Sequence, residues 1–148
     1  HGHHRRQRQM CIRDRDRRGI ARLWLNRPDK HHAMNAQMIS ELHQAALELS
    51  RDQAVRAVVI GSDGPIFCAG ADLTWMQEQQ QKDKVGRIAE ARTLSDMLTA
   101  INSMPKPVII RVQGKLLLGY KHGVLVSRSL CLLLQILQLW LGSSLVSQ

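Results

Sequence analysis

Residues 58–73 constrain the fold of this chain more than any other run. They begin with the apolar, β-branched residues 58–60, which are typical of a buried strand. A loop of Gly, Ser, Asp and Pro follows, and the small residues 68–71 lead into a helix that we expect to begin at Asp72. Small side chains before a helix leave its first backbone N–H groups uncovered. The run therefore predicts a pocket for an anion, or for an oxygen on which negative charge develops.

The hydrophobic pattern around this run predicts an α/β layer. We expect strands at 20–25, 55–60 and 108–112, and helices at 35–51 (with Asn35 as N-cap) and 85–104. Strands that alternate with helices favour crossover connections within one sheet. The expected buried residues are Met38, Ile39, Leu42, Ala45, Ala46 and Leu49 in the first helix, and Ile88, Ala91, Leu94, Leu98 and Ile101 in the second.

The basic charge of the chain is concentrated at its start. Of the net charge of +9, residues 1–18 contribute +5, since they hold seven arginines and two aspartates. An arm with so few apolar residues is expected to be disordered. Binding of nucleic acid through this arm is an alternative function. However, no aromatic residues interleave with the arginines to stack on bases, so we expect no nucleic-acid partner.

Cysteine spacing and hydropathy limit the other classes of function. Cys11, Cys68 and Cys131 have no metal-ligand spacing, so we expect no metal site and a reduced, cytoplasmic setting. The N-terminus has no apolar stretch of the kind found in signal peptides. The leucine-rich run 130–141 is too short to span a membrane, so we expect no membrane role.

Three segments, in order, carry a family resemblance. The sequence Phe-Cys-Ala-Gly-Ala-Asp-Leu at 67–73 resembles the oxyanion-hole signature of the crotonase superfamily, the enoyl-CoA hydratases and isomerases. Residues 25–36 resemble the family's early loop with Asn-Arg-Pro and Asn-Ala, and residues 106–114 resemble its Lys-Pro-Val strand. The resemblance covers 19–114 and implies the N-terminal part of a crotonase-like fold of repeated β-β-α units. Within it, Ala-Asp-Leu-Thr-Trp-Met is most similar to the branch that hydrates methylglutaconyl-type CoA esters.

The resemblance implies an acyl-CoA thioester as substrate, with coenzyme A as part of that substrate and no separate cofactor. It makes the Ala71 N–H the first oxyanion donor and the Gly119 N–H the second. It places the adenine and ribose-phosphate end near Lys30, His32 and Ala33. The residues that it places along the pantetheine arm are Ala69, Ala71, Asp72 and Leu73.

Several of these residues have simpler interpretations. The carboxylate of Asp72 is expected to cap the following helix, which leaves its backbone for the site. Cys68 is expected to be a small buried residue rather than a nucleophile. His31 and His32 are expected to be solvated loop residues rather than ligands. These expectations depend on the tertiary structure.

The agreement with the family ends at Gly114. His122 lies where the first catalytic glutamate is expected, and the second would lie near Gly142. No Asp or Glu follows Asp96, so neither carboxylate is supplied by a shift in alignment. We treat residues 115–148 as an atypical leucine-rich tail, either frameshifted or divergent; His122 as a replacement base is a weaker alternative. The expected function is a hydratase of 2-enoyl-CoA with weak or no activity, and the alternative is a non-catalytic acyl-CoA-binding fragment. The family forms trimers or hexamers through C-terminal helices without counterpart here, so we do not expect this assembly.

Overall fold

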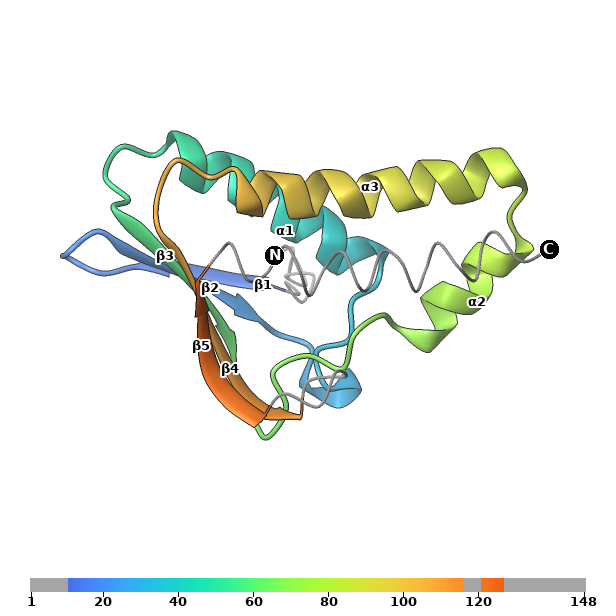
Figure 1. Cartoon of the computed structure of the whole chain (residues 1–148), viewed down its shortest axis with the longest axis horizontal. Coiled ribbons are helices and arrows are strands. Elements are labelled where there is room, and N and C mark those ends of the chain that lie inside the picture. The colour runs from blue at the N-terminus through green and yellow to red at the C-terminus, as the bar shows by residue number, and fades with distance from the viewer. Residues whose placement is uncertain (1–10, 116–120, 127–148) are drawn as a thin grey trace, which may run out of the picture.

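The computed structural model of the chain describes residues 11–115 and 121–126 (Figure 1). Its described strands form one five-stranded sheet, in which the order of the strands follows their order in the chain. The strands are β1 (Cys11–Arg15), β2 (Ile20–Leu25), β3 (Ala57–Ser62), β4 (Val108–Lys115) and β5 (Lys121–Val126). The helices are α1 (Ala36–Arg51), α2 (Leu73–Gln81) and α3 (Lys84–Asn102), with a 3-10 turn, η1, at Pro28–Lys30.

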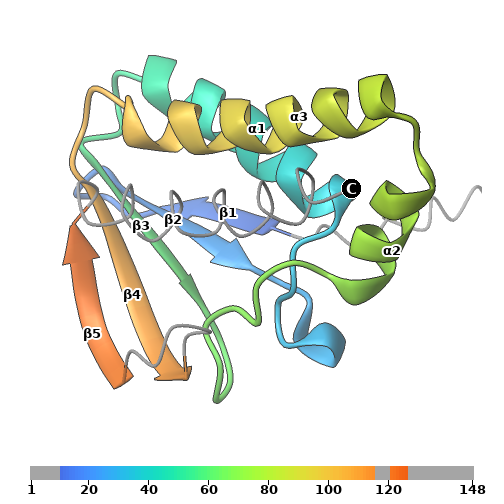
Figure 2. The same ribbon diagram turned by 45° about the vertical axis from the view of Figure 1, so that its right-hand side comes forward.

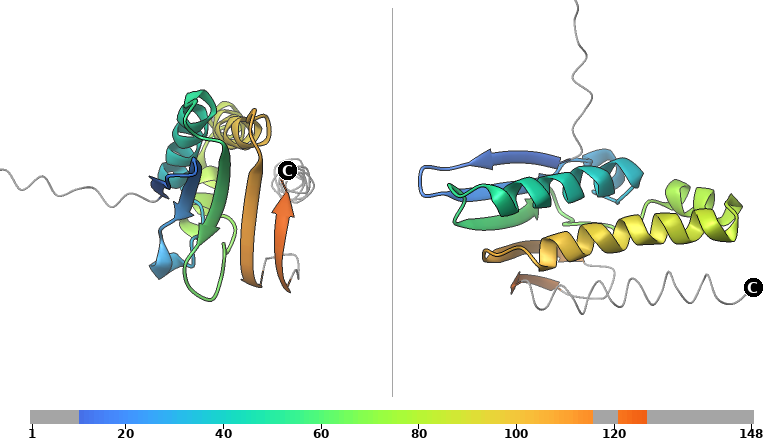
Figure 3. Two further views of the ribbon diagram at one scale, coloured as in Figure 1. Left: turned by 90° about the vertical axis from the view of Figure 1, so that its left-hand side faces the viewer. Right: turned by 90° about the horizontal axis from the view of Figure 1, so that it is seen from above.

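The three central strands, β2, β3 and β4, are parallel, and β1 and β5 pair with them in antiparallel fashion at the two edges. Helix α1 connects β2 to β3, and α2 and α3 connect β3 to β4. Helices α1 and α3 lie side by side over the sheet (Figures 2 and 3). This arrangement confirms the predicted α/β layer. Because parallel strands end at the same edge of the sheet, the segments that follow β2, β3 and β4 are brought together.

The buried face of α1 consists of the six residues that its periodicity predicts. Asn35 is the N-cap, as expected, and its side-chain oxygen accepts the Met38 N–H at 3.0 Å. At the other end of α1, the Lys106 ammonium donates to the C=O of Leu49 at 2.5 Å and also to the C=O of Asp52. A cation on the last carbonyls of a helix stabilises that end. Lys106, which begins the Lys-Pro-Val motif, therefore holds the end of α1 close to the start of β4.

The buried face of α3 differs from the prediction in its N-terminal half. Leu94, Leu98 and Ile101 are buried as expected, together with Met97. Ile88 and Ala91 are exposed, so the prediction for these two residues is wrong. The reason is visible in Figure 1, where the N-terminal half of α3 extends past α1 toward α2. Helical periodicity marks a face but does not say how far the neighbouring helix reaches.

Residues 11–18 are ordered, which corrects the prediction of a disordered arm over 1–18; residues 1–10 lie outside the described part. Strand β1 pairs with β2 from Cys11↔Leu25 to Arg15↔Ala21. In the turn, the Asp16 carboxylate accepts the N–H groups of Arg18 and Ile20 at 2.9 and 3.0 Å. These hydrogen bonds need no apolar side chains, which is why composition did not reveal the strand. No helix in the described residues is long and apolar enough to span a bilayer.

Candidate functional site

Two loops meet at the carboxyl edge of the parallel strands. The first loop, residues 26–35, follows β2, and the second loop, residues 63–72, follows β3. A single parallel β-bridge joins Met34 to Ala71. In this bridge the Met34 N–H donates to the C=O of Gly70 at 2.7 Å, and the Asp72 N–H donates to the C=O of Met34 at 2.8 Å. The backbone of residues 70–72, in the segment that the sequence analysis highlighted, is therefore held by hydrogen bonds to the first loop.

The bridge determines the direction of the Ala71 N–H. The Gly70 C=O and the Ala71 N–H belong to one trans peptide, in which they point in opposite directions. Because the Gly70 C=O faces Met34, the Ala71 N–H faces away from the first loop. Ala71 is half-buried, and within the described residues no acceptor is bonded to its N–H. This donor lies one residue before Asp72, the N-cap of α2, at the end of the helix where the dipole favours negative charge.

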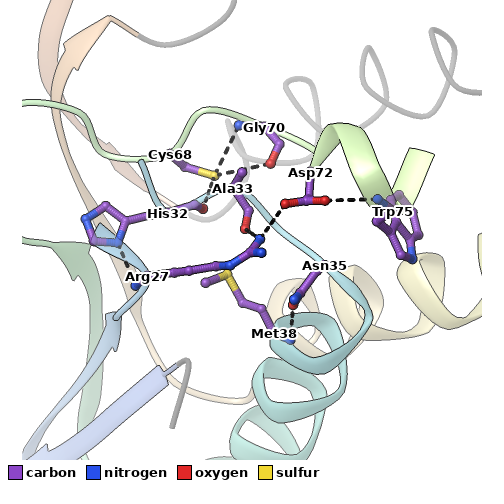
Figure 4. Close-up of polar contacts among 9 residues, drawn as sticks. All are labelled: Arg27, His32, Ala33, Asn35, Met38, Cys68, Gly70, Asp72 and Trp75. Carbon is purple, nitrogen blue, oxygen red and sulfur yellow. Dashed lines mark hydrogen bonds and ion pairs between the residues drawn. The ribbon is translucent and has the colours of Figure 1, made fainter. Parts of the chain in front are cut away.

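Both carboxylate oxygens of Asp72 accept hydrogen bonds from within the protein (Figure 4). Its Oδ1 accepts the Trp75 N–H at 2.9 Å, which confirms the predicted helix cap. Its Oδ2 accepts from Nη1 of Arg27 at 2.8 Å, and the side chains of this ion pair are only 9% and 15% exposed. The Trp75 N–H, and then the Arg27 guanidinium, hold the pKa of Asp72 below its usual value. With its N–H bonded to Met34, Asp72 has a structural role.

His32 is buried, which corrects the expectation of a solvated loop residue, whereas His31 is exposed as expected. Both residues have left-handed backbones, with φ of 49° for His31 and 58° for His32. The His32 Nδ1 accepts the Arg27 N–H at 3.1 Å, and Nε2 lies 2.7 Å from the C=O of Asp63. These partners assign the proton to Nε2. The side chain of His32 therefore connects the two loops, and both of its ring nitrogens have partners within the protein.

The remaining residues expected to bind coenzyme A differ in accessibility. Lys30 is exposed at the end of η1 and forms no ion pair with a described carboxylate. Leu73 is 75% exposed at the start of α2. Ala33 is buried, and its C=O accepts from Nη1 of Arg27 at 3.0 Å. The N–H of Ala69 donates to the first loop at 2.9 Å, so it is not free for a ligand.

Cys68 is buried, as expected, and burial raises the pKa of its thiol. Its Sγ lies 3.1 Å from the C=O of His32, so the thiol adds a further contact between the loops. Within residues 11–115 and 121–126, no cluster of His, Cys, Asp or Glu side chains is suited to a metal ion. Cys68 is thus part of the packing of the site.

The end of β4 closes against the second loop. The Gln113 side chain donates to the C=O groups of Ser62 and Gly64 at 2.8 and 3.1 Å. Gly114 has φ +73°, and a Cβ built on it would lie 1.9 Å from the C=O of Pro65. Only glycine fits this approach. Sequence reasoning missed the roles of Gln113 and Arg27, although both lie in the motif segments.

The predicted second donor, Gly119, lies outside the described residues. The segment after it forms β5, which pairs with β4 and places His122 on a strand. The expected positions of the two glutamates therefore stay predictions. Of the site that the sequence predicted, the structure describes the first donor and the two loops that hold it.

Comparison with known proteins identifies sequences similar to this chain. A family profile described as enoyl-CoA hydratase/isomerase matches residues 15–121. The mitochondrial enoyl-CoA hydratase domain-containing protein 2 of Bos taurus is 33% identical over 107 residues, which are 72% of this chain and 35% of that protein. The mitochondrial Δ(3,5)-Δ(2,4)-dienoyl-CoA isomerase of Homo sapiens is 38% identical over 105 residues, covering 64% of this chain and 31% of that protein.

The fold likewise matches a solved structure. An enoyl-CoA hydratase from Shewanella pealeana superposes with a TM-score of 0.70 and 33% identity, over 73% of this chain and 40% of that chain. The chain thus spans between about a third and two fifths of the length of these proteins.

Proposed function

The chain belongs to the enoyl-CoA hydratase/isomerase family, and from this premise we propose that it binds an enoyl-CoA thioester with the carbonyl oxygen at the Ala71 N–H. The observation that carries the proposal is the direction of this donor, which the Met34–Gly70 hydrogen bond turns away from the first loop. An oxygen placed there accepts a hydrogen bond at the positive end of α2. Removal of one such donor typically costs about 3 kcal/mol of transition-state stabilisation.

The two similar proteins differ in their named reactions, one a hydratase and the other an isomerase. Both reactions on an unsaturated thioester place negative charge on the carbonyl oxygen, and an oxyanion donor stabilises that charge. This shared step is the part that the described loops support. For the parent activity we propose reversible hydration of a 2-enoyl-CoA, with methylglutaconyl as the acyl group favoured by residues 71–76.

Lys30 is the residue that we propose for the phosphate end of coenzyme A. It is exposed on the turn that follows β2, and no described carboxylate neutralises it. An ammonium group on a flexible side chain binds phosphate as a mobile point charge. The side chains of His32 and Ala33 next to it are buried and shape the first loop.

Proton transfer is the step of hydration for which the sequence offers no carboxylate at the expected positions. Hydration needs a general acid and a general base, and no Asp or Glu follows Asp96. We therefore propose that the chain binds and polarises the thioester but hydrates it slowly or not at all. The alternative of a non-catalytic acyl-CoA-binding chain differs from this only in turnover.

Binding of butyryl-CoA labelled with ¹³C at the carbonyl tests the proposal. Calorimetry measures affinity, and infrared spectroscopy measures polarisation, since hydrogen bonding lowers the C=O stretching frequency. We expect binding with a lowered frequency, and weaker binding for Lys30→Ala. Lys84→Ala, which removes an exposed lysine on α3, is the matched control and should bind like the unsubstituted chain. Absence of binding, or an unshifted carbonyl, overturns the proposal.

A hydratase assay separates binding from catalysis. With crotonyl-CoA and methylglutaconyl-CoA we expect little or no formation of the 3-hydroxyacyl product. Rapid turnover of either substrate would contradict the proposed weakness of proton transfer and would require an acid and a base supplied by other residues.

A further inference from the structure

We propose that Arg27 is a positioning residue that fixes the direction of the Ala71 N–H. The proposal rests on the proposed function of Ala71 as an oxyanion donor. A single nitrogen of Arg27, Nη1, lies 3.0 Å from the C=O of Ala33 and 2.8 Å from Oδ2 of Asp72 (Figure 4). Ala33 directly precedes Met34, and Asp72 directly follows Ala71. The guanidinium therefore holds both sides of the bridge that orients the donor.

Arg27 is itself held firmly at its backbone. Its N–H donates to Nδ1 of His32, and its C=O accepts the N–H groups of His32 and Lys30 at 2.9 and 3.1 Å. The side chain is 15% exposed, so water competes little for its hydrogen bonds. A charged donor shared between a carboxylate and a carbonyl is among the stronger polar contacts in proteins. Arg27 thus fixes the start of α2 relative to the first loop.

The bridge alone is a weak constraint on this donor. It consists of two hydrogen bonds that flank Ala71, and the residue before Ala71 is Gly70, with φ +92°. Glycine permits many backbone conformations, so the Gly70–Ala71 peptide can rotate once Met34 moves away. Rotation of this peptide would turn the Ala71 N–H away from the thioester oxygen. By holding Ala33 and Asp72 together, Arg27 keeps Met34 within bonding distance of Gly70.

Three variants of the full chain test this role. Arg27→Met removes the guanidinium but keeps an apolar side chain. Asp72→Asn removes the charge of the partner while asparagine still caps α2. Arg92→Met, which removes an exposed arginine on α3, is the matched control. The first readout is the ¹⁵N NMR order parameter of the Ala71 amide, which reports motion of this peptide without any ligand.

We expect the Ala71 order parameter to fall from about 0.85 to below about 0.6 in Arg27→Met and to fall in Asp72→Asn, with Arg92→Met unchanged. The second readout is the C=O stretch of bound ¹³C-butyryl-CoA, which should move back toward that of the free thioester in the first two variants.

The outcomes separate this proposal from the function of the site. If the unsubstituted chain does not bind butyryl-CoA, the proposed function fails, and the Ala71 order parameters alone decide whether Arg27 positions the peptide. Arg27→Met with an unchanged order parameter and an unchanged carbonyl frequency overturns the proposal. If circular dichroism shows that Arg27→Met is unfolded, Asp72→Asn decides by the same two readouts.

Discussion

His32 and Asp63 join the two loops through one part-buried hydrogen bond, in which the Nε2–H of His32 donates to the C=O of Asp63 at 2.7 Å. The other ring nitrogen accepts the N–H of Arg27. The histidine is 4% exposed, so water has little access to either ring nitrogen. The imidazole thereby links the residue proposed to position Ala71 to the strand end from which the second loop begins.

Replacement of His32 by alanine should destabilise the chain, because it leaves the Arg27 N–H and the Asp63 C=O without their partner. An unsatisfied buried group costs about 1–3 kcal/mol. Because Asp63 is exposed, water can bond to its C=O in the variant, so we expect the free energy of unfolding to fall by about 1–3 kcal/mol in urea denaturation. His31→Ala is a matched control, since His31 is exposed and has the same left-handed backbone. Equal losses in the two variants would contradict the role of the ring.

Gly114→Ala should be strongly destabilising, because its Cβ would lie 1.9 Å from the C=O of Pro65. Strain at positive φ and overpacking together should lower the free energy of unfolding by about 3–5 kcal/mol. Gly64→Ala isolates the strain, since Gly64 has φ +92° with no atom within 4 Å of an added Cβ. We expect a loss of about 1–2 kcal/mol there. Thermal and urea unfolding of both variants measure the difference, and similar losses would contradict the contact with Pro65.

Asp72 should make the stability depend on pH under acidic conditions. Its pKa is lower in the folded chain than in the unfolded chain, so the unfolded state binds the proton more readily. Its contribution is therefore complete above about pH 4 and is lost as the pH falls through the folded pKa. Asp72→Asn should flatten the acid limb of the stability curve relative to Asp96→Asn, a substitution on the exposed face of α3. Identical acid limbs for the two variants, measured by urea titrations from pH 2 to 6, would contradict this contribution of Asp72.

Cys68 should resist thiol reagents while the chain is folded. Burial raises the pKa of its thiol, so the reactive thiolate is scarce and the sulfur is inaccessible. With an aromatic disulfide reagent at pH 8, we expect the peptide that contains Cys68 to be labelled only after urea is added, as measured by mass spectrometry. Labelling of the native chain at the rate seen in urea would show that the second loop opens readily.

Much of the fold was predictable because its signals are local. The buried face of α1 follows from apolar residues three and four apart, and Asn35 and Asp72 cap helices within three residues of themselves. Strand β1 was missed, because its pairing with β2 depends on backbone hydrogen bonds that composition does not reveal. The prediction that Ile88 and Ala91 are buried is wrong, because periodicity contains no information on where α1 ends in space.

The sequence alone determined the segment that carries the site, since small residues before a helix cap expose backbone donors wherever they occur. It also determined, through its motifs, the family to which the chain belongs. Only the tertiary structure decided which groups hold the donor in place. Arg27 and Asp72 are 45 positions apart, and His32 and Asp63 are 31 apart. Such partners meet only because the parallel strands end at one edge of the sheet. For the same reason, the sequence alone does not distinguish the exposed His31 from the buried His32.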